Sequence, residues 1–267
     1  MVLIGHSMGH LCVVIICRVV TLKLMLMLGE ISAVTAAAGL AAGGYLYAGM
    51  WPTSQIFGRA ILGGGDPSEF ALTYDDGPND ACTEALLEIL SRYDVRATFF
   101  VIGRFVAQRK ELVRRIRAAG HLVGNHTMTH PVLLFQSPAR VREELAGTNA
   151  AIEDALGEKV RYFRPPHGAR RPDVLRTARE LGLTPVLWNA MGYDWKPTTG
   201  EVIVANLDKG IRRNRAAGRG SNLLLHDGGQ AGIGQDRSAS VAATETLLRR
   251  EIPNGVRFVT VDEWNGS

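Results

Sequence analysis

Two adjacent carboxylates follow an apolar run that is typical of a β-strand. The run is 70–74, and Asp75 and Asp76 come directly after it, ahead of Gly77 and Pro78. Because the side chains of an extended chain alternate in direction, one acid can bind a cation while the other faces a substrate. The alternative is an Asp-Gly-Pro turn in which both acids are solvated or cap the next helix.

Two histidines, His126 and His130, follow a later strand-like run over 121–124. They share one face if their segment is helical, and neutral imidazoles are common ligands of zinc and neighbouring divalent ions. A lone histidine would favour a structural role. The pair, with a carboxylate available from the first strand end, predicts a metal site.

Arg164 follows another apolar run and precedes two prolines. Prolines lack a backbone donor and stiffen a loop, which would hold the guanidinium beside an ionised carboxylate. The alternative is a rigid turn that carries a surface arginine.

A further histidine, His226, ends an apolar run, and Asp194 lies in the loop after the preceding run. A carboxylate that hydrogen-bonds this imidazole would keep it protonated. The alternative makes His226 and Asp227 a strand-ending turn. The histidines that we interpret as structural or solvent-facing are His6, His10 and His121.

Strand-like and helical patterns alternate along the part of the chain that carries these residues. Seven strands are predicted, over 70–74, 97–102, 121–124, 162–163, 184–188, 222–225 and 257–261. Amphipathic helical patterns lie between them, over 84–90, 111–119, 140–156, 172–181, 201–215 and 241–250. This order predicts an α/β fold with a parallel sheet, closed as a barrel or open, and with its chemistry at the carboxyl ends of the strands.

Composition excludes several classes of protein. With 46% hydrophobic and 21% charged residues in 267 positions, the chain is too apolar for a disordered protein. The net charge of +4 comes from scattered basic residues, so we expect no nucleic-acid partner. Three cysteines, two of them in an apolar N-terminal run, provide no disulfide framework and no Cys-rich zinc site.

The N-terminal segment differs from the rest. Residues 31–51 carry no charge over 21 positions, which as a helix is about the thickness of a bilayer core. Trp51 and two tyrosines mark the outer end, where amphipathic aromatics favour the membrane interface. Arg18 and Lys23 precede the segment and favour a cytoplasmic N-terminus. We therefore expect a membrane anchor with an extracytoplasmic domain.

Two alternatives for 31–51 stay open, a cleaved signal peptide that would release a secreted protein and a buried Ala-rich helix. Residues 1–30 are interpreted as a weaker hydrophobic lead-in. If translation begins at Met25 or Met27, most of this stretch lies upstream of the true start. A Gly-rich linker is predicted over 52–67, followed by the catalytic domain over 68–267.

Five motifs occur in the order and approximate spacing of a known family. They are Thr73 to Pro78, His126-x-x-x-His130, Arg164-Pro165-Pro166, Asp194-Trp195 and Leu224-Leu225-His226. The chain resembles, over about 68–262, the polysaccharide deacetylases, also called carbohydrate esterase family 4 or the NodB-homology domain. The resemblance implies a distorted, incomplete (β/α)7 TIM-like barrel, here preceded by the N-terminal hydrophobic membrane segment.

The resemblance also implies metal-dependent hydrolysis of N-acetyl groups on amino sugars. Asp76, His126 and His130 would bind one divalent ion, with zinc expected ahead of cobalt, manganese or nickel. Asp75 would be the general base, and Arg164 would orient it.

Other positions carry over in the same way. The backbone N–H of His167 would stabilise the oxyanion, and His226, tuned by Asp194, would protonate the leaving amine. The residues that would shape the acetyl pocket are Pro166, Trp195 and Leu224.

Two positions depart from the family pattern. His167 stands where tyrosine is usual, and Tyr74 stands where phenylalanine is commoner. The expected partner is an acetylated glycan, either peptidoglycan or a chitin-like oligomer, and the oligomeric state is not predicted. The alternatives are a deacylase or deformylase of a lipid-linked amino sugar, and a catalytically inactive carbohydrate-binding copy of the fold.

Overall fold

The structure, a computed structural model, describes residues 23, 25, 27 and 35–264. The predictions for His6 and His10, for most of the lead-in and for the first residues of the expected anchor lie outside the described part. The chain divides into two compact units, 1–47 and 48–267. The second unit contains every motif described above.

Residues 35–50 are helical. Among the described residues, no helix combines the length and the apolar character that a membrane crossing needs. The expected anchor begins at residue 31, before this described segment, so the anchor stays a prediction.

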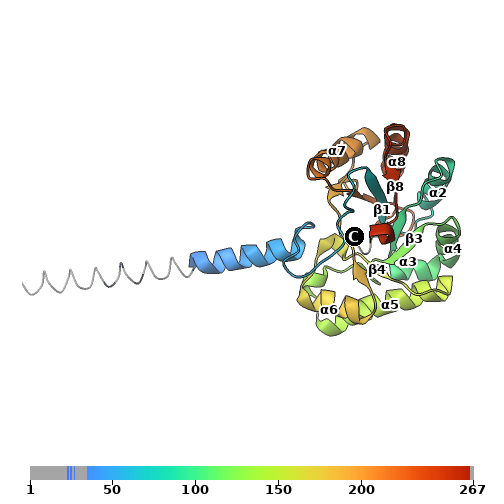
Figure 1. Ribbon diagram of the computed structural model, residues 1–267. Coiled ribbons are helices and arrows are strands. Elements are labelled where there is room, and N and C mark those ends of the chain that lie inside the picture. The colour runs from blue at the N-terminus through green and yellow to red at the C-terminus, as the bar shows by residue number, and fades with distance from the viewer. Residues whose placement is uncertain (1–22, 24, 26, 28–34, 265–267) are drawn as a thin grey trace, which may run out of the picture. The chain divides into compact units, whose positions relative to one another are not determined.

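Parallel strands form the centre of the second unit (Figure 1). The strands are β1 (Glu69–Gly77), β2 (Thr98–Val101), β3 (Leu122–Asn125), β4 (Tyr162–Phe163), β5 (Thr184–Pro185), β6 (Ala190–Met191), β7 (Ser221–His226) and β8 (Arg257–Phe258). Their order is β5-β4-β3-β2-β1-β7-β6, with β8 paired to the start of β1. The second unit is therefore an α/β half-barrel of parallel strands, which is consistent with the expected distorted, incomplete barrel.

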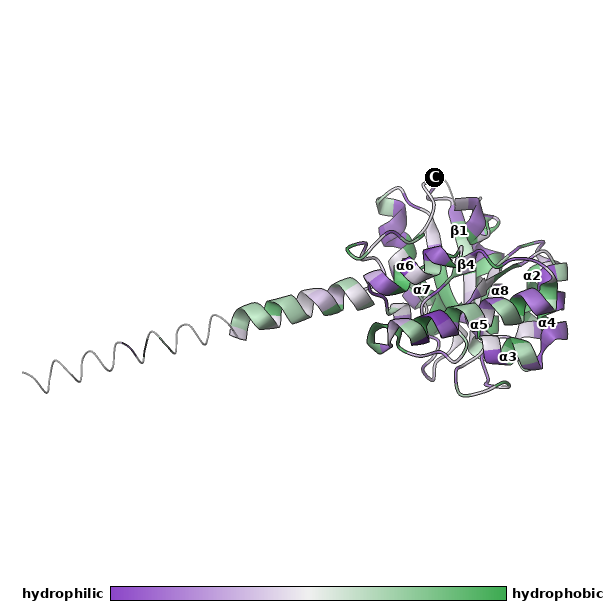
Figure 2. Cartoon of the chain, turned by 90° about the horizontal axis from the view of Figure 1, so that it is seen from below, coloured by the Kyte–Doolittle hydropathy of each residue, from purple (hydrophilic) through white to green (hydrophobic). Residues whose placement is uncertain are grey.

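Helices surround this sheet on its outer side (Figure 1). They are α2 (Thr83–Arg92), α3 (Gly103–Gln108), α4 (Lys110–Ala118), α5 (Pro138–Leu156), α6 (Pro172–Glu180), α7 (Gly200–Ala216) and α8 (Ser238–Glu251). Short 3-10 turns are η1 (Leu133–Phe135), η2 (Pro166–Gly168) and η3 (Val261–Trp264). In Figure 2 the outer faces of several helices are hydrophilic and the strands between them are hydrophobic.

The strand predicted over 184–188 is shorter than expected. After β5 the chain leaves the β4 edge, and Val186 forms a parallel bridge with Ile61. The amide of Leu187 also donates to the carbonyl of Ile61, at 2.9 Å. The chain then joins β7 as β6, so one predicted strand becomes two short strands on different edges of the sheet. Residue 61 belongs to the predicted linker, which therefore packs on the barrel.

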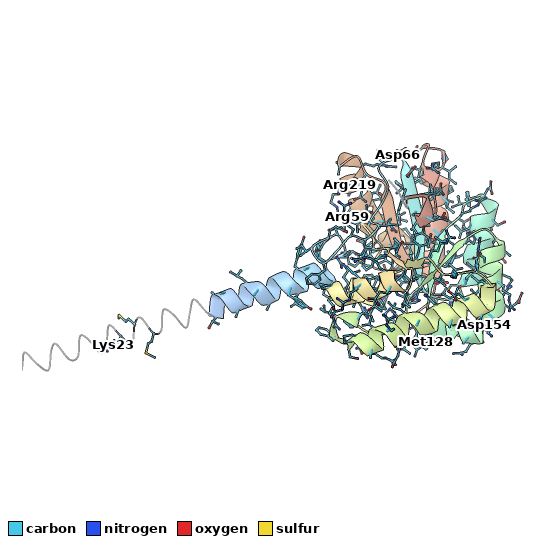
Figure 3. All side chains as sticks on the ribbon, turned by 60° about the horizontal axis from the view of Figure 1, so that its bottom comes forward. Lys23, Arg59, Asp66, Met128, Asp154 and Arg219 are labelled. Atoms are coloured by element: carbon cyan, nitrogen blue, oxygen red, sulfur yellow. The ribbon has the colours of Figure 1, made fainter. Side chains whose placement is uncertain are left out.

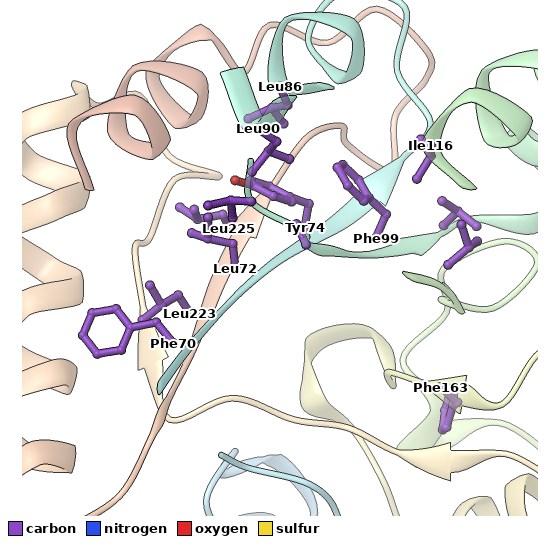
Figure 4. Packing of buried hydrophobic residues seen from close by; sticks show 14 of the residues in the cluster. Phe70, Leu72, Tyr74, Leu86, Leu90, Phe99, Ile116, Phe163, Leu223 and Leu225 are labelled. Atoms are coloured by element: carbon purple, nitrogen blue, oxygen red, sulfur yellow. The ribbon is translucent and has the colours of Figure 1, made fainter. Parts of the chain in front are cut away.

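Alternation along β1 determines which residues face the site. Phe70, Leu72 and Tyr74 point toward the helices and join the main hydrophobic core (Figure 4). Tyr74 stacks on Phe99 with 5.0 Å between ring centroids. The intervening residues point the other way, which brings Asp75 into the barrel interior.

Candidate metal centre and catalytic pocket

A pocket of about 630 Å³ lies where the carboxyl ends of β1, β3 and β7 meet. This volume is within the usual range for small-molecule sites, about 300–1,000 Å³. The predicted site residues that line it are Asp75, Asp76, His126, His130, His167, Trp195, Leu224 and His226. Three other predicted residues, Arg164, Pro166 and Asp194, are buried and do not line it.

The two adjacent carboxylates reach the same pocket because β1 is irregular at its end. Regular alternation would place Asp76 on the face opposite Asp75. Asp76 instead has φ 74°, and the pairing with β2 shifts register between Asp75 and Gly77. A non-glycine residue in this region of φ is uncommon and strained, and such residues concentrate at functional sites.

Asp76, His126 and His130 form a cluster that can hold a metal ion. One ligand atom from each residue lies within 4.8 Å of the other two. Oδ1 of Asp76 is 3.3 Å from Nε2 of His126 and 3.1 Å from Nε2 of His130. Two ligands of a tetrahedral zinc ion are about 3.3 Å apart, which matches this spacing.

The protonation of the cluster also fits a cation. Oδ1 of Asp76 is buried and accepts no hydrogen bond. Burial would raise the pKa of Asp76, but the imidazoles of His126 and His130 outweigh burial and hold this pKa well below its usual range. A charged, buried oxygen without a donor is costly unless a cation neutralises it. The three residues therefore fit a divalent ion.

Contacts on the far side of each imidazole orient it. Nδ1 of His126 lies 2.8 Å from the carbonyl oxygen of Arg164, and Nδ1 of His130 lies 2.6 Å from Oε1 of Gln230. Both partners are oxygens that accept, so each Nδ1 carries a proton, and each Nε2 faces Asp76, where a bound metal would take the place of any Nε2 proton.

The segment that carries His126 and His130 is not helical, so the two residues do not meet as neighbours on one helical face. Their segment is a loop, in which Thr127 has φ 67° and His130 has φ 64°. The side chain of Asn125 accepts from the Thr127 amide at 2.8 Å, and the Thr127 hydroxyl accepts from the His130 amide at 3.1 Å. These local hydrogen bonds replace a helical turn and bring the two rings to 5.0 Å between centroids.

Arg164 is fully buried and holds Asp75. Its Nη1 donates to Oδ1 of Asp75 at 2.8 Å and to Oγ1 of Thr73 at 2.8 Å. The guanidinium also lies 4.3 Å from the ring centroid of Phe100. Burial lowers the pKa of Arg164, whereas the charge of Asp75 opposes that shift.

Removal of this guanidinium should destabilise the fold. In Arg164→Met, measured in chelator-treated protein by urea denaturation, we expect the free energy of unfolding to fall by about 3–5 kcal/mol, because Asp75 keeps a buried charge without its partner. The double variant Arg164→Met, Asp75→Asn should recover most of the loss. A loss below about 1 kcal/mol in the single variant, as for a surface ion pair, would contradict this account.

His226 and Asp194 form a second buried pair. Nδ1 of His226 lies 2.8 Å from Oδ1 of Asp194, and the His226 amide donates to Oδ2 at 2.7 Å. The hydroxyl of Ser240 donates to the same Oδ2 at 2.7 Å. Burial would lower the pKa of His226, but the charge of Asp194 and its hydrogen bond outweigh burial and raise this pKa to about 9. The imidazole is therefore protonated at neutral pH.

His167 occupies the loop between β4 and α6. It has φ 57°, and its ring centroid lies 4.7 Å from that of His130. Burial, followed by the charges of His130 and His126, lowers the pKa of His167 to about 4, so its ring is neutral. His167 therefore lines the pocket with a neutral imidazole.

Sequence reasoning missed several residues that support the site. Thr73 and Asn222 contact Arg164 inside the barrel, and Gln230 holds His130. Asp227 is buried beside Gly77, and burial raises its pKa to about 7. The alternation of β1 could have found Thr73, whereas Gln230 lies in a loop without any pattern.

The fold and the site together define an α/β half-barrel protein with a two-histidine, one-aspartate cluster beside a second carboxylate, which Arg164 holds. The polysaccharide deacetylase family model matches residues 63–186. A chitooligosaccharide deacetylase of Bradyrhizobium sp. (strain ANU 289) is 41% identical over 182 residues, which are 68% of this chain and 80% of that protein. The chain belongs to the polysaccharide deacetylase family.

Two further relatives act on a different glycan according to their names. A peptidoglycan-N-acetylglucosamine deacetylase of Bacillus cereus is 36% identical over 195 residues, which are 72% of this chain and 86% of that protein. The crystal structure of the Bc1960 peptidoglycan N-acetylglucosamine deacetylase superposes with a TM-score of 0.69 at 28% identity, over 77% of this chain and 91% of that one.

Proposed function

We propose that this chain is a metal-dependent hydrolase that removes acetyl groups from N-acetylglucosamine residues of a glycan. The observation that carries the proposal is the convergence on one pocket of a metal-binding cluster, a free carboxylate and a protonated imidazole. Hydrolysis breaks the amide C–N bond and yields acetate and a free amine. The named relatives deacetylate chitooligosaccharides or peptidoglycan, which supports this choice of substrate.

Asp76, His126 and His130 would hold one divalent ion, which we propose to be zinc, since a set of two imidazoles and one carboxylate suits it well. Cobalt, manganese and nickel fit the same donors. When bound, such an ion acts as a Lewis acid, which makes water more acidic and polarises the acyl oxygen.

The chain's own residues would move the protons. Asp75, held by Arg164, is placed to take a proton from the attacking water, since its Oδ2 lies 3.7 Å from Nε2 of His126. His226 would give a proton to the leaving amine and remain oriented by Asp194. The backbone N–H of His167 would donate to the oxyanion, while Pro166 stiffens that loop. Trp195 and Leu224 line the same pocket and would contact the acetyl group.

The pair of His226 and Asp194 predicts a pH profile. The acid must be protonated, so kcat/KM should be retained below pH 9 and should fall as pH rises through about 9. Asp194→Asn removes the charge that raises the pKa, so the alkaline limb should move to lower pH. Ser240→Ala, which keeps the charge of Asp194, should move the alkaline limb less. An alkaline limb at the same pH in the parent and in Asp194→Asn would refute the assignment.

Acetate and formate release should be measured from N-acetylglucosamine oligomers, peptidoglycan fragments and lipid-linked amino sugars, with protein reconstituted with zinc. We expect acetate from a glycan. Formate, or release only from lipid-linked sugars, would favour the deacylase alternative. Binding to the oligomers without release would make the chain an inactive carbohydrate-binding copy.

We propose further that residues 68–267 are the catalytic domain and that the part of the N-terminal segment 31–51 that precedes Ala48 tethers it outside the cytoplasm. Peptidoglycan, a glycan of the cell envelope, is the substrate named for the Bacillus cereus relative, which supports an exported domain. Membrane fractionation and N-terminal sequencing of the protein in its host should find the intact chain in the membrane. A shorter protein in the medium would indicate a cleaved signal peptide instead.

A further inference from the structure

Two further cavities adjoin the catalytic pocket. A cavity of about 330 Å³ shares Trp51, Pro52, Trp188 and Met191 with the pocket and extends to α7. A larger one, of about 1020 Å³, also includes Trp51 and continues past Arg213. We call these two cavities together the lateral groove. Trp51 lies where the pocket and both parts of the groove meet.

The position of Trp51 is fixed by the barrel. The buried Arg170 donates from Nη2 to the carbonyl oxygens of Trp51, at 2.9 Å, and Ser54, at 2.5 Å. Its amide donates to the carbonyl of Gly49 at 2.9 Å. Residues 49–54 are thus held against the loop that carries His167. The Trp51 side chain remains 55% exposed, although the sequence predicts it at a membrane interface.

The lateral groove is basic. Lys209 and Arg213 on α7 line its first part, and Arg59, Arg213 and Arg219 line the second (Figure 3 labels Arg59 and Arg219). Within the described part of the chain, no Asp or Glu lines either cavity and none of the four cations forms a salt bridge. Arg213 donates to the Asn189 carbonyl at 2.5 Å, and Lys209 donates to Asn206 at 3.1 Å. Both cations therefore keep charge that no carboxylate neutralises.

We propose that the lateral groove binds the sugar units beside the reacting one and prefers a glycan whose neighbouring sugars carry carboxylates. This inference rests on the proposed deacetylase function and makes its substrate class more specific. The C–H face of a sugar ring packs on an exposed indole, which assigns to Trp51 the sugar next to the reacting residue. Lys209 and Arg213 would pair with the carboxylate of that neighbour.

The lining residues that the groove shares with the pocket favour a glycan over an anionic membrane as its ligand. A lipid headgroup would need no passage to the metal cluster, whereas a strand that places one sugar in the pocket must leave it along an adjoining groove. A neutral chitin-like oligomer would use Trp51 without using the cations. The groove thus favours a glycan with free carboxylates on the neighbouring sugars, such as a peptidoglycan strand whose N-acetylmuramic acid carries no peptide.

The test compares two tetrasaccharides of alternating N-acetylglucosamine and N-acetylmuramic acid, one with free carboxylates and one with those carboxylates amidated. Lys209→Gln, Arg213→Gln should raise KM for the acidic substrate roughly tenfold with kcat unchanged, and leave KM for the amidated one unchanged. NaCl should raise the parent's KM for the acidic substrate alone. Trp51→Ala should raise KM for both tetrasaccharides, whereas Trp51→Phe should keep both KM values close to those of the parent.

Arg212→Gln is the matched control, since it removes the same charge from the same helix and Arg212 lines neither cavity. Equal KM values for the two substrates in the parent, or an unchanged KM in the charge variant, would overturn the proposal. If the charge variant kept the parent's kinetics but lost binding to phosphatidylglycerol vesicles, the groove would be a membrane site and the proposal would also be overturned. Absence of acetate release by the parent would refute the proposed function instead, and calorimetric binding of both tetrasaccharides would still test the groove.

Discussion

His130→Ala is expected to lose the bound divalent ion and to slow acetate release by roughly a thousandfold or more. The substitution leaves Asp76 and His126 as the only protein ligands of the cluster, and Lewis-acid stabilisation is worth several kcal/mol of the activation barrier. Metal content by mass spectrometry should fall from about one ion per chain to near zero. Treatment of the parent with a chelator should give the same loss, and added zinc should restore the parent but not the variant.

His121→Asn is the control for this substitution. His121 is also buried, but its Nδ1 accepts a hydrogen bond from the Ala97 amide at 3.1 Å, and burial lowers its pKa to about 4. Its role is structural, so the variant should keep its ion whenever it folds. Full activity of the chelated parent, or a full complement of metal in His130→Ala, would exclude the cluster as the metal site.

The sequence predicts the strand order along the chain and most of the site because chemistry follows strand ends. In a parallel sheet the carboxyl ends of the strands meet at one edge. Asp75, His126 and His226 each end an apolar run, so their meeting in one pocket follows from the alternating pattern alone. The pattern alone left a surface arginine at Arg164 and a strand-ending turn at His226 as alternatives, so the supporting roles of Arg164 and Asp194 rested on the resemblance to the family.

What the sequence does not predict depends on backbone conformation rather than on residue pattern. The positive φ of Asp76 turns its side chain into the pocket, and hydrogen bonds from Asn125 and Thr127 shape the histidine loop without a helix. Neither the Asp76 conformation nor the loop hydrogen bonds produce a repeating pattern of apolar residues in the sequence. Trp51 looked like part of a membrane anchor because hydropathy ignores long-range contacts such as the one with Arg170.

Asp75→Asn is expected to lower kcat roughly a thousandfold while KM and metal content stay near the parent's values. The amide keeps the size of the carboxylate and a contact with Arg164, but it has no basic oxygen for the proton of the attacking water. General-base catalysis contributes about 10²–10⁴-fold, which sets the size of the effect. Steady-state acetate release gives kcat and KM, and metal analysis of the same preparation gives the ion content.

Asp227→Asn tests whether Asp75 or the neighbouring buried carboxylate of Asp227 is the general base. Asp227 is fully buried and its pKa is raised to about 7 by burial, a value that suits a general base, but it does not line the pocket. Its Oδ2 accepts from the Thr83 hydroxyl at 2.5 Å instead. We expect Asp75 rather than Asp227 to be the base despite the suitable pKa of Asp227, because a base must reach the proton that it removes. We therefore expect Asp227→Asn to lower stability more than kcat, and a larger loss of kcat there than in Asp75→Asn would reassign the base.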